Sequence, residues 1–167
     1  DGLSKDPAIY AKFTAQVVRD AKEQTLRTIV NLLVTQKGDY RDLFTTRQTF
    51  LNRSMGAVYR VPVENAAFDQ WVPYTFGSEE PRAGILTLAG FLMWDPTHEG
   101  KTSPTVRGKS TRELFLCQKV PAPPANVDFT KFQYSKNPFK TARERLTAHR
   151  SNPVCAACHG ITDPIGL

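Results

Sequence analysis

The chain has 167 residues, enough for one domain with a hydrophobic core or for two small ones. Hydrophobic residues make up 40% of it and charged residues 23%, which is typical of a globular protein and excludes a collagen, a coiled coil or a disordered acidic tail. The net charge is +6, but the 22 Lys and Arg are mixed with 16 Asp and Glu along the chain, so we expect a solvated basic surface and no nucleic-acid partner.

No stretch of the sequence predicts a membrane span or a leader peptide. The longest apolar run, residues 83–94, is too short to cross a bilayer. Residues 1–6 are polar and lack the apolar stretch of a secretory signal. We therefore expect no transmembrane segment, and a mature or internally cut N-terminus fits this start as well as a cytoplasmic one does.

The chain opens with a predicted helical region. Asp6 is a residue type that caps helices, and Pro7 is a residue type common in the first helical turn. Apolar residues then recur at helical spacing as far as Leu33, and Gly38 is a typical helix end. We expect one long helix here, or two helices joined near Asp20.

Shorter elements are predicted for the next part of the chain. Residues 39–44 are typical of a turn and a short helix, and residues 50–59 form a second amphipathic helical stretch. Residues 61–82 mix aromatic residues with three prolines and one glycine. This composition predicts an irregular connection that contains one hairpin.

The second half of the sequence again predicts helices, now separated by proline-rich loops. The apolar residues 83–94, residues 105–119 and the strongly polar residues 141–150 each fit a helix. Residues 121–124 are typical of a stiff extended linker, and Cys117 is expected to be a small buried apolar residue. Few stretches predict strands, so the expected fold class is mainly α, an irregular helical fold with long proline-rich loops.

One motif in the sequence has the pattern of a cofactor site. Cys155, Ala156, Ala157, Cys158 and His159 have the spacing of c-type haem attachment. Cysteines three residues apart can place both sulfurs along one porphyrin edge, where each adds to a vinyl group as a thioether. The adjacent histidine can offer a ring nitrogen to the iron. The motif therefore predicts one covalent haem c, attached through both cysteines and ligated by the histidine.

Three other interpretations of the motif are weaker. A zinc site needs four ligands, and the remaining candidates, Cys117, His98 and His149, contain no second pair at ligand spacing. A thioredoxin-like redox pair follows a strand, whereas the segment before this motif is predicted to be a helix. The third interpretation is that the pattern arose by chance. Because the chain has only three cysteines, a chance match to all the required positions of the five-residue pattern is rare. The odd cysteine count also argues against a disulfide framework.

A covalent haem has consequences for location and folding. In bacteria the attachment to reduced cysteines takes place outside the cytoplasmic membrane, so we expect a periplasmic or extracellular protein. Gly160 is expected to let the backbone turn away from the haem. Because an apolar macrocycle would form part of the core, we expect poor folding without it.

The ligand on the other face of the iron decides between electron transfer and catalysis, because it sets the reduction potential and the access of small molecules. The candidates are Met55, Met93, His98 and His149, or a residue beyond Leu167. Both methionines lie in apolar stretches that favour core packing. The polar loop around His98 favours a solvated side chain, and His149 fits a helix C-terminus.

Basic residues are candidates for binding the haem propionates, because arginine pairs well with carboxylates. The candidates are Arg107, with Lys109 beside it, and Arg150, with Arg143 and Arg145 nearby. A charged surface explains each of them equally well. The sequence contains no evident Ser-His-Asp set, phosphate loop or close carboxylate pair.

Several blocks of the sequence resemble a known group of proteins. These blocks, in chain order, are residues 82–87, 102–108, 121–127, 149–150, 155–159 and 163–167. Together they resemble the uncharacterised, planctomycete-type cytochrome-like domain families of large secreted bacterial proteins. Residues 50–53 and Tyr59 resemble the domain that usually precedes this one. The resemblance implies a c-type haem and an exported multi-domain parent, but no settled activity.

The resemblance also implies how the chain is organised. A helical domain over residues 1–75 precedes a cytochrome c-like haem module over residues 76–167. In the family, more chain follows the block that ends here at Leu167. We therefore expect a truncated fragment, with the rest of the parent chain or another subunit completing the haem pocket.

The expected function is that of a c-type cytochrome module that transfers single electrons to a redox partner protein or another haem subunit. One alternative is a haem-dependent oxidase or peroxidase-like subunit, which requires a five-coordinate, high-spin iron and a polar distal pocket. The other is a structural subunit stapled by a haem that lies far from solvent and from other redox centres.

Overall fold

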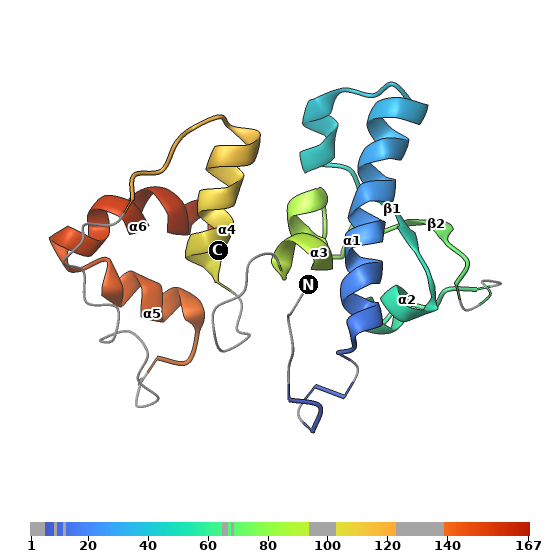
Figure 1. Ribbon diagram of the computed structural model, residues 1–167, viewed down its shortest axis with the longest axis horizontal. Helices are drawn as coiled ribbons and strands as arrows, with labels where there is room; N and C mark the ends of the chain where they lie inside the picture. Colours follow the sequence, from blue (N-terminus) through green and yellow to red (C-terminus); the bar gives the residue numbers. More distant parts are fainter. Residues whose placement is uncertain are drawn as a thin grey trace. The chain divides into compact units, whose positions relative to one another are not determined.

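A computed structural model of the chain describes residues 6–8, 10–11, 13–64, 67, 69–93, 103–122 and 139–167. These residues are mainly helical, which confirms the prediction of a mainly α fold. The chain divides into two compact units, Asp1–Gly100 and Lys101–Leu167, which we describe in turn (Figure 1). Among the helices that the structure describes, none combines the length and the apolarity needed to cross a bilayer.

Helix α1, Ala15–Val30, runs through the first unit and continues into a π-helical turn, Asn31–Thr35. It begins later than the start predicted at Asp6. The side chain of Thr14 caps the helix by accepting a hydrogen bond from the N–H of Val17 at 3.2 Å, so the helical pattern starts there.

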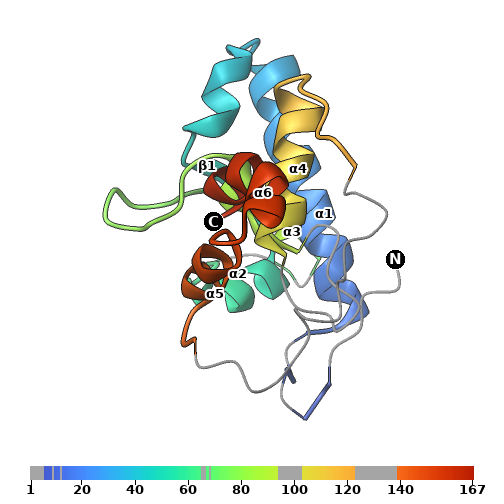
Figure 2. The ribbon, with the colours of Figure 1, turned by 90° about the vertical axis from the view of Figure 1, so that its left-hand side faces the viewer.

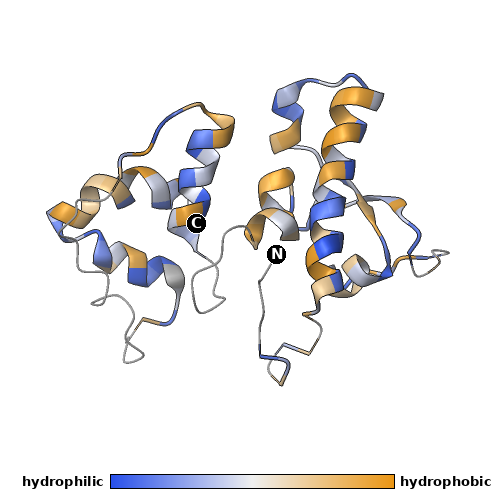
Figure 3. Cartoon of the chain, in the orientation of Figure 1, coloured by the Kyte–Doolittle hydropathy of each residue, from blue (hydrophilic) through white to orange (hydrophobic). Residues whose placement is uncertain are grey.

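The end of this helical region agrees with the stop predicted at Gly38. Lys37 has a left-handed φ of 53°, and the N–H of Gly38 donates to the carbonyl of Leu32 at 2.8 Å. Apolar residues gather at this end of α1 and in the turn after it (Figure 3). Val30 and Val34 there are 50% and 68% exposed.

Strands β1, Gln48–Leu51, and β2, Val72–Thr75, form an antiparallel pair, and β1 packs against α1 (Figure 1; Figure 2 gives the view turned by 90°). Leu51 lies opposite Val72 in the register and is fully buried. The prediction of a hairpin within residues 61–82 was wrong, because the partner of β2 lies outside that segment. Pairing between distant segments depends on tertiary packing, which local composition does not reveal.

Short helices flank β1 in the sequence. The 3₁₀ turn Tyr40–Phe44 confirms the short helix predicted there. Helix α2, Arg53–Tyr59, covers most of the amphipathic stretch predicted for residues 50–59. It starts later than predicted because the side chain of Asn52 caps it, accepting a hydrogen bond from the N–H of Met55 at 2.8 Å.

The apolar residues 83–94 do not form the single helix that was predicted. They contain a 3₁₀ turn, Ile85–Thr87, and the short helix α3, Ala89–Leu92. Gly84 explains why the helix does not start earlier. It has a left-handed φ of 72°, and a Cβ there would lie 2.2 Å from the carbonyl oxygen of Phe44.

A buried hydrogen-bond network joins three helices of the first unit. The hydroxyl of Tyr59 donates to Oε1 of Gln24 at 2.8 Å and accepts from the N–H of Ala89 at 2.8 Å. Because unpaired buried polar groups are costly, this phenol helps to determine how α1, α2 and α3 pack. The apolar core around it contains Val17, Ala21, Leu43, Leu51, Met55, Phe76, Ile85, Leu88 and Phe91.

The described part of the second unit contains helices α4, Pro104–Ser110, α5, Ala142–His149, and α6, Pro153–Gly166 (Figure 1). Helix α5 confirms the polar helix predicted for residues 141–150. Residues 123 and 124 of the predicted stiff linker lie outside the described residues.

The helix predicted over residues 105–119 ends early, in a π-helical turn, Thr111–Phe115. Cys117 follows with a left-handed φ of 53° and is exposed, so the prediction of a buried cysteine was wrong. The prediction relied on the usual burial of free cysteines, whereas here a left-handed residue redirects the chain after the helical turn.

Helices α4 and α6 pack closely because glycines let their backbones approach. A Cβ on Gly108 of α4 would lie 1.8 Å from the carbonyl oxygen of Thr162, and one on Gly166 of α6 would lie 1.7 Å from that of Pro104. Arg107 adds a hydrogen bond from Nη2 to the carbonyl of Gly166 at 2.6 Å. This packing brings one face of α4 directly against α6.

Candidate functional site

The motif from Cys155 to His159 lies in the first half of α6. The side chain of Asn152 caps this helix by accepting a hydrogen bond from the N–H of Val154 at 3.0 Å. Cys155, Cys158 and His159 follow at positions i, i+3 and i+4, so they share one face of the helix. Both cysteines are half-buried and free of any disulfide, which leaves their sulfurs available for thioether bonds.

Gly160 does not play the role predicted for it. It lies inside α6, which continues to Gly166, so the backbone does not turn away after His159. A helical conformation is available to any residue, and the chain here keeps its direction through the motif. The prediction assumed that the helix ended before Cys155.

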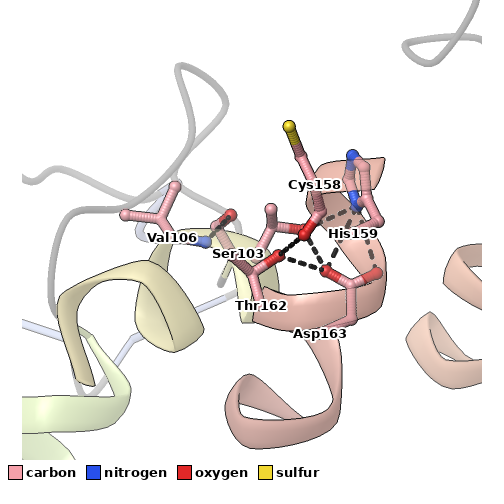
Figure 4. Close-up of polar contacts among 7 residues, drawn as sticks. Ser103, Val106, Cys158, His159, Thr162 and Asp163 are labelled. Carbon is pink, nitrogen blue, oxygen red and sulfur yellow. Dashed lines mark hydrogen bonds and ion pairs between the residues drawn. The ribbon is translucent and has the colours of Figure 1, made fainter. Parts of the chain in front are cut away.

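The imidazole of His159 is held by a carboxylate one helical turn further on. Its Nδ1 lies 3.2 Å from Oδ1 and 3.1 Å from Oδ2 of Asp163. Nδ1 also lies 3.4 Å from the hydroxyl of Thr105 on α4. Figure 4 shows the other ring nitrogen pointing away from the carboxylate, toward the side on which the sulfur of Cys158 projects.

Asp163 is the site residue that sequence reasoning missed. Its side chain is fully buried, and Thr105 donates to Oδ1 at 2.8 Å. Thr162 lies next to it and donates to the same oxygen at 3.3 Å. The signal in the sequence was the spacing, because a carboxylate four residues after a histidine on a helix lies beside it.

Of the four residues proposed as distal ligands, the structure brings His149 next to the motif. Its ring lies edge-on to that of His159, with 4.5 Å between centroids and 83° between planes. Burial lowers the pKa of His149 and the neighbouring His159 lowers it further, while Asp163 opposes both effects. His149 is therefore favoured in its neutral form, the form that binds metals.

Of the other distal candidates, the structure describes Met55 and Met93, and both belong to the first unit. Met55 is fully buried in the core of the first unit, which favours the packing role considered for it. Met93 follows α3 in the same unit and is half-buried. His98 lies outside the described residues.

The propionate candidates differ in their surroundings. Arg107 is buried between α4 and α6, and this burial lowers the pKa of its guanidinium. Arg150 is half-buried at the end of α5. Arg145 has a buried Nε for which the described residues provide no hydrogen-bond partner, while Arg143 and Lys109 are exposed.

The donor set of α6 fits haem better than a bare metal ion. Among the described residues, no group of three or more His, Cys, Asp or Glu side chains is arranged to hold a metal ion by itself. A porphyrin supplies four nitrogens to its iron, so the protein needs to provide one imidazole nitrogen and two thiols at the macrocycle edge. His159, Cys155 and Cys158 are such a set, and the contact with Asp163 is the kind that orients a ligating histidine.

Comparison with protein families gives two matches along the chain. Residues 1–61 match PSD4, described as a protein of unknown function (DUF1592), and residues 82–167 match PSCyt3, described as a protein of unknown function (DUF1588). No curated protein matches the chain, and no solved structure does. The second match begins before α3, so it includes residues that pack in the first unit as well as the whole of the second. Because this match takes in more than half of the chain, the protein belongs to the PSCyt3 (DUF1588) family, whose members are planctomycete cytochrome-like domains of unknown function.

Proposed function

We propose that this chain is a c-type cytochrome module that carries one covalent haem c and transfers single electrons. The observation that carries the proposal is the geometry on α6. Two free cysteines and a histidine share one helix face, and the histidine is held through Nδ1 by a buried carboxylate. The membership of a cytochrome-like family supports the same conclusion.

Each residue of the motif has a separate role in the proposal. Cys155 and Cys158 would attach the porphyrin through thioether bonds. These covalent bonds would keep the haem on the chain even if the folded pocket had no affinity for it. His159 donates its Nε2 lone pair to the iron, because Nδ1 faces Asp163. A bound haem supplies an iron that gains and loses one electron.

His149 is the distal ligand that we favour within this chain. It is the distal candidate that lies beside His159, and its lowered pKa keeps a nitrogen lone pair available at neutral pH. To ligate the opposite face, its ring would have to move away from His159 to admit the macrocycle. Two histidine ligands would give a low-spin iron with a low reduction potential.

The proposal includes a location and an organisation. Covalent haem attachment implies an exported protein, periplasmic or extracellular, with a redox partner protein or another haem subunit. We retain residues 76–167 as the haem module and residues 1–75 as the preceding domain, with further chain or another subunit completing the pocket. The positive net charge would favour an acidic face on the partner.

The experiment is expression of the full chain in a bacterial host that exports it and attaches c-type haem. Haem that stays on the polypeptide after acid-acetone extraction, with a c-type pyridine haemochrome spectrum, is the expected result. The double variant Cys155→Ala/Cys158→Ala should lose this haem. The matched control is Cys117→Ala, which removes an exposed cysteine outside the motif and should keep it.

The outcomes separate the alternatives. A colourless chain, in a host where a known c-type cytochrome matures normally, would overturn the proposal. A covalent haem with a high-spin, five-coordinate iron would instead favour the oxidase or peroxidase-like function. A low-spin spectrum in both oxidation states supports electron transfer.

A further inference from the structure

We propose that Asp163 is a positioning residue for His159, which holds the imidazole with Nε2 toward the haem and lowers the reduction potential of the iron. This inference rests on the proposed function, since it concerns how the chain tunes a haem bound there. It assigns a role to a residue outside the attachment motif, and to its contact with α4.

The burial of the carboxylate is the first argument. The side chain of Asp163 is fully buried, and a buried charge is costly unless it is paired and hydrogen-bonded. The structure provides hydrogen-bond partners for it: Thr105 donates from the neighbouring helix at 2.8 Å, and Nδ1 of His159 lies 3.1 Å from Oδ2. A carboxylate placed only to stabilise a helix surface would not need to be enclosed.

The chemistry of the contact determines the tautomer of His159. An ionised carboxylate can only accept hydrogen bonds, so Nδ1, which faces both oxygens of Asp163, carries the proton. In a neutral ring Nε2 then has the free lone pair. Figure 4 shows that this nitrogen points away from Asp163, on the side of the Cys158 sulfur. The carboxylate therefore selects the nitrogen that binds iron and the direction in which it points.

A negative charge at this position also affects the electron density of the ligand. A hydrogen bond from Nδ1–H to a carboxylate raises the basicity of a ligating imidazole. A more basic imidazole stabilises the oxidised iron, which lowers the reduction potential. The enclosure of Asp163 strengthens this effect, because charges interact more strongly where water is excluded.

The close packing of α4 on α6 holds the carboxylate in place. Gly108 and Gly166 let the two backbones approach, and this approach brings the Thr105 hydroxyl within hydrogen-bond distance of Asp163. The contact spans 58 residues of sequence. The tuning of the site therefore depends on tertiary packing and not on the motif alone.

The test is the reduction potential of the haem-loaded full chain with the substitution Asp163→Asn. Asparagine keeps an oxygen that can accept from Nδ1–H but removes the charge, so haem attachment should persist. We expect the potential to rise by about 59 mV, a tenfold change in the one-electron reduction equilibrium. The substitution Asp163→Glu, which restores the charge, should return the potential toward that of the parent.

The matched control is Glu144→Gln, the same change of charge at an exposed residue of α5 in the same unit. Water screens its charge, so the potential should stay within a small fraction of the Asp163→Asn shift. A purely structural role for Asp163 predicts a lower stability with an unchanged potential. Covalent haem with an unchanged potential in Asp163→Asn would therefore refute the inference while leaving the proposed function intact.

Wild-type protein provides a second measurement if Asp163→Asn does not accumulate. In the reduced protein labelled with ¹⁵N-histidine, the Nδ1 proton of His159 should be present and should exchange slowly with solvent. An Nδ1 without a proton would show that the carboxylate does not act on the ring as inferred. A wild-type chain without haem would refute the proposed function itself. A haem-loaded chain with an unchanged potential in Asp163→Asn would refute only the role of Asp163, so the two failures are distinguishable.

Discussion

A methyl group added at Gly108 tests how closely α4 and α6 pack. In the variant Gly108→Ala, the new Cβ would lie 1.8 Å from the carbonyl oxygen of Thr162 and 2.6 Å from its carbonyl carbon. Real Cβ contacts essentially never fall below 3.0 Å. The two backbones must therefore move apart by roughly 1 Å at this point before the side chain fits.

The magnitude follows from two opposing effects. Overpacking costs about 1–3 kcal/mol, and we expect about 3 kcal/mol here because the obstructing atoms are backbone and no side chain can move aside. Alanine is a better helix former than glycine by about 1 kcal/mol, which offsets part of this cost. The free energy of unfolding should fall by about 2 kcal/mol. The displacement would also move Thr105 away from Asp163, because Thr105 lies one turn earlier on α4.

The assay is urea unfolding of the full chain followed by far-ultraviolet circular dichroism. The matched control is Gly160→Ala on α6, where no atom lies within 4 Å of the added Cβ. This control should leave stability unchanged or raise it by up to about 1 kcal/mol. A Gly108→Ala variant that is as stable as Gly160→Ala would refute the close approach of α4 and α6.

Other side chains give further predictions. Tyr59→Phe should lower the free energy of unfolding by about 1–3 kcal/mol in urea, because Gln24 and the N–H of Ala89 lose a buried partner. Burial raises the pKa of Tyr59 above its usual 10.0. The stability that Tyr59 contributes is therefore complete below pH 10.0 and is lost as the pH rises through the raised pKa. The difference in unfolding free energy between the parent and Tyr59→Phe should shrink in that pH range. Asn152→Ala removes the cap of α6 and should cost about 1 kcal/mol in the same unfolding assay, with Ser151→Ala as its neighbouring control. A cost for Ser151→Ala equal to that for Asn152→Ala would contradict the capping role.

The parts of the fold that depend on neighbours in sequence were predictable. The motif from Cys155 to His159 is five contiguous residues, so the haem proposal could be made without a structure. The polar helix α5 was predicted because its pattern and its cap at Thr141 are local. The short 3₁₀ turn Tyr40–Phe44 follows from Asp39, whose side chain accepts from a backbone N–H two residues on.

Predictions failed where a distant segment decides the conformation. The break at Gly84 exists because the backbone of Phe44 lies too close for a Cβ, and neither residue reveals this alone. Strand β2 needed its partner β1, and a strand without a partner is hard to distinguish from an irregular loop. Cys117 was predicted to be buried because free cysteines usually are, but it follows a π-helical turn with a left-handed φ and is exposed.

In the candidate site, too, the local sequence predicts some features and tertiary packing decides the others. The proposal that Cys155, Cys158 and His159 bind haem follows from their spacing, because a helix turn alone brings them to one face. The nitrogen that His159 presents, and the enclosure of Asp163 behind it, depend on the packing of α4 against α6. Burial is a property of the whole unit, since the residues that exclude water from a carboxylate come from another helix, and so only the tertiary structure decides it.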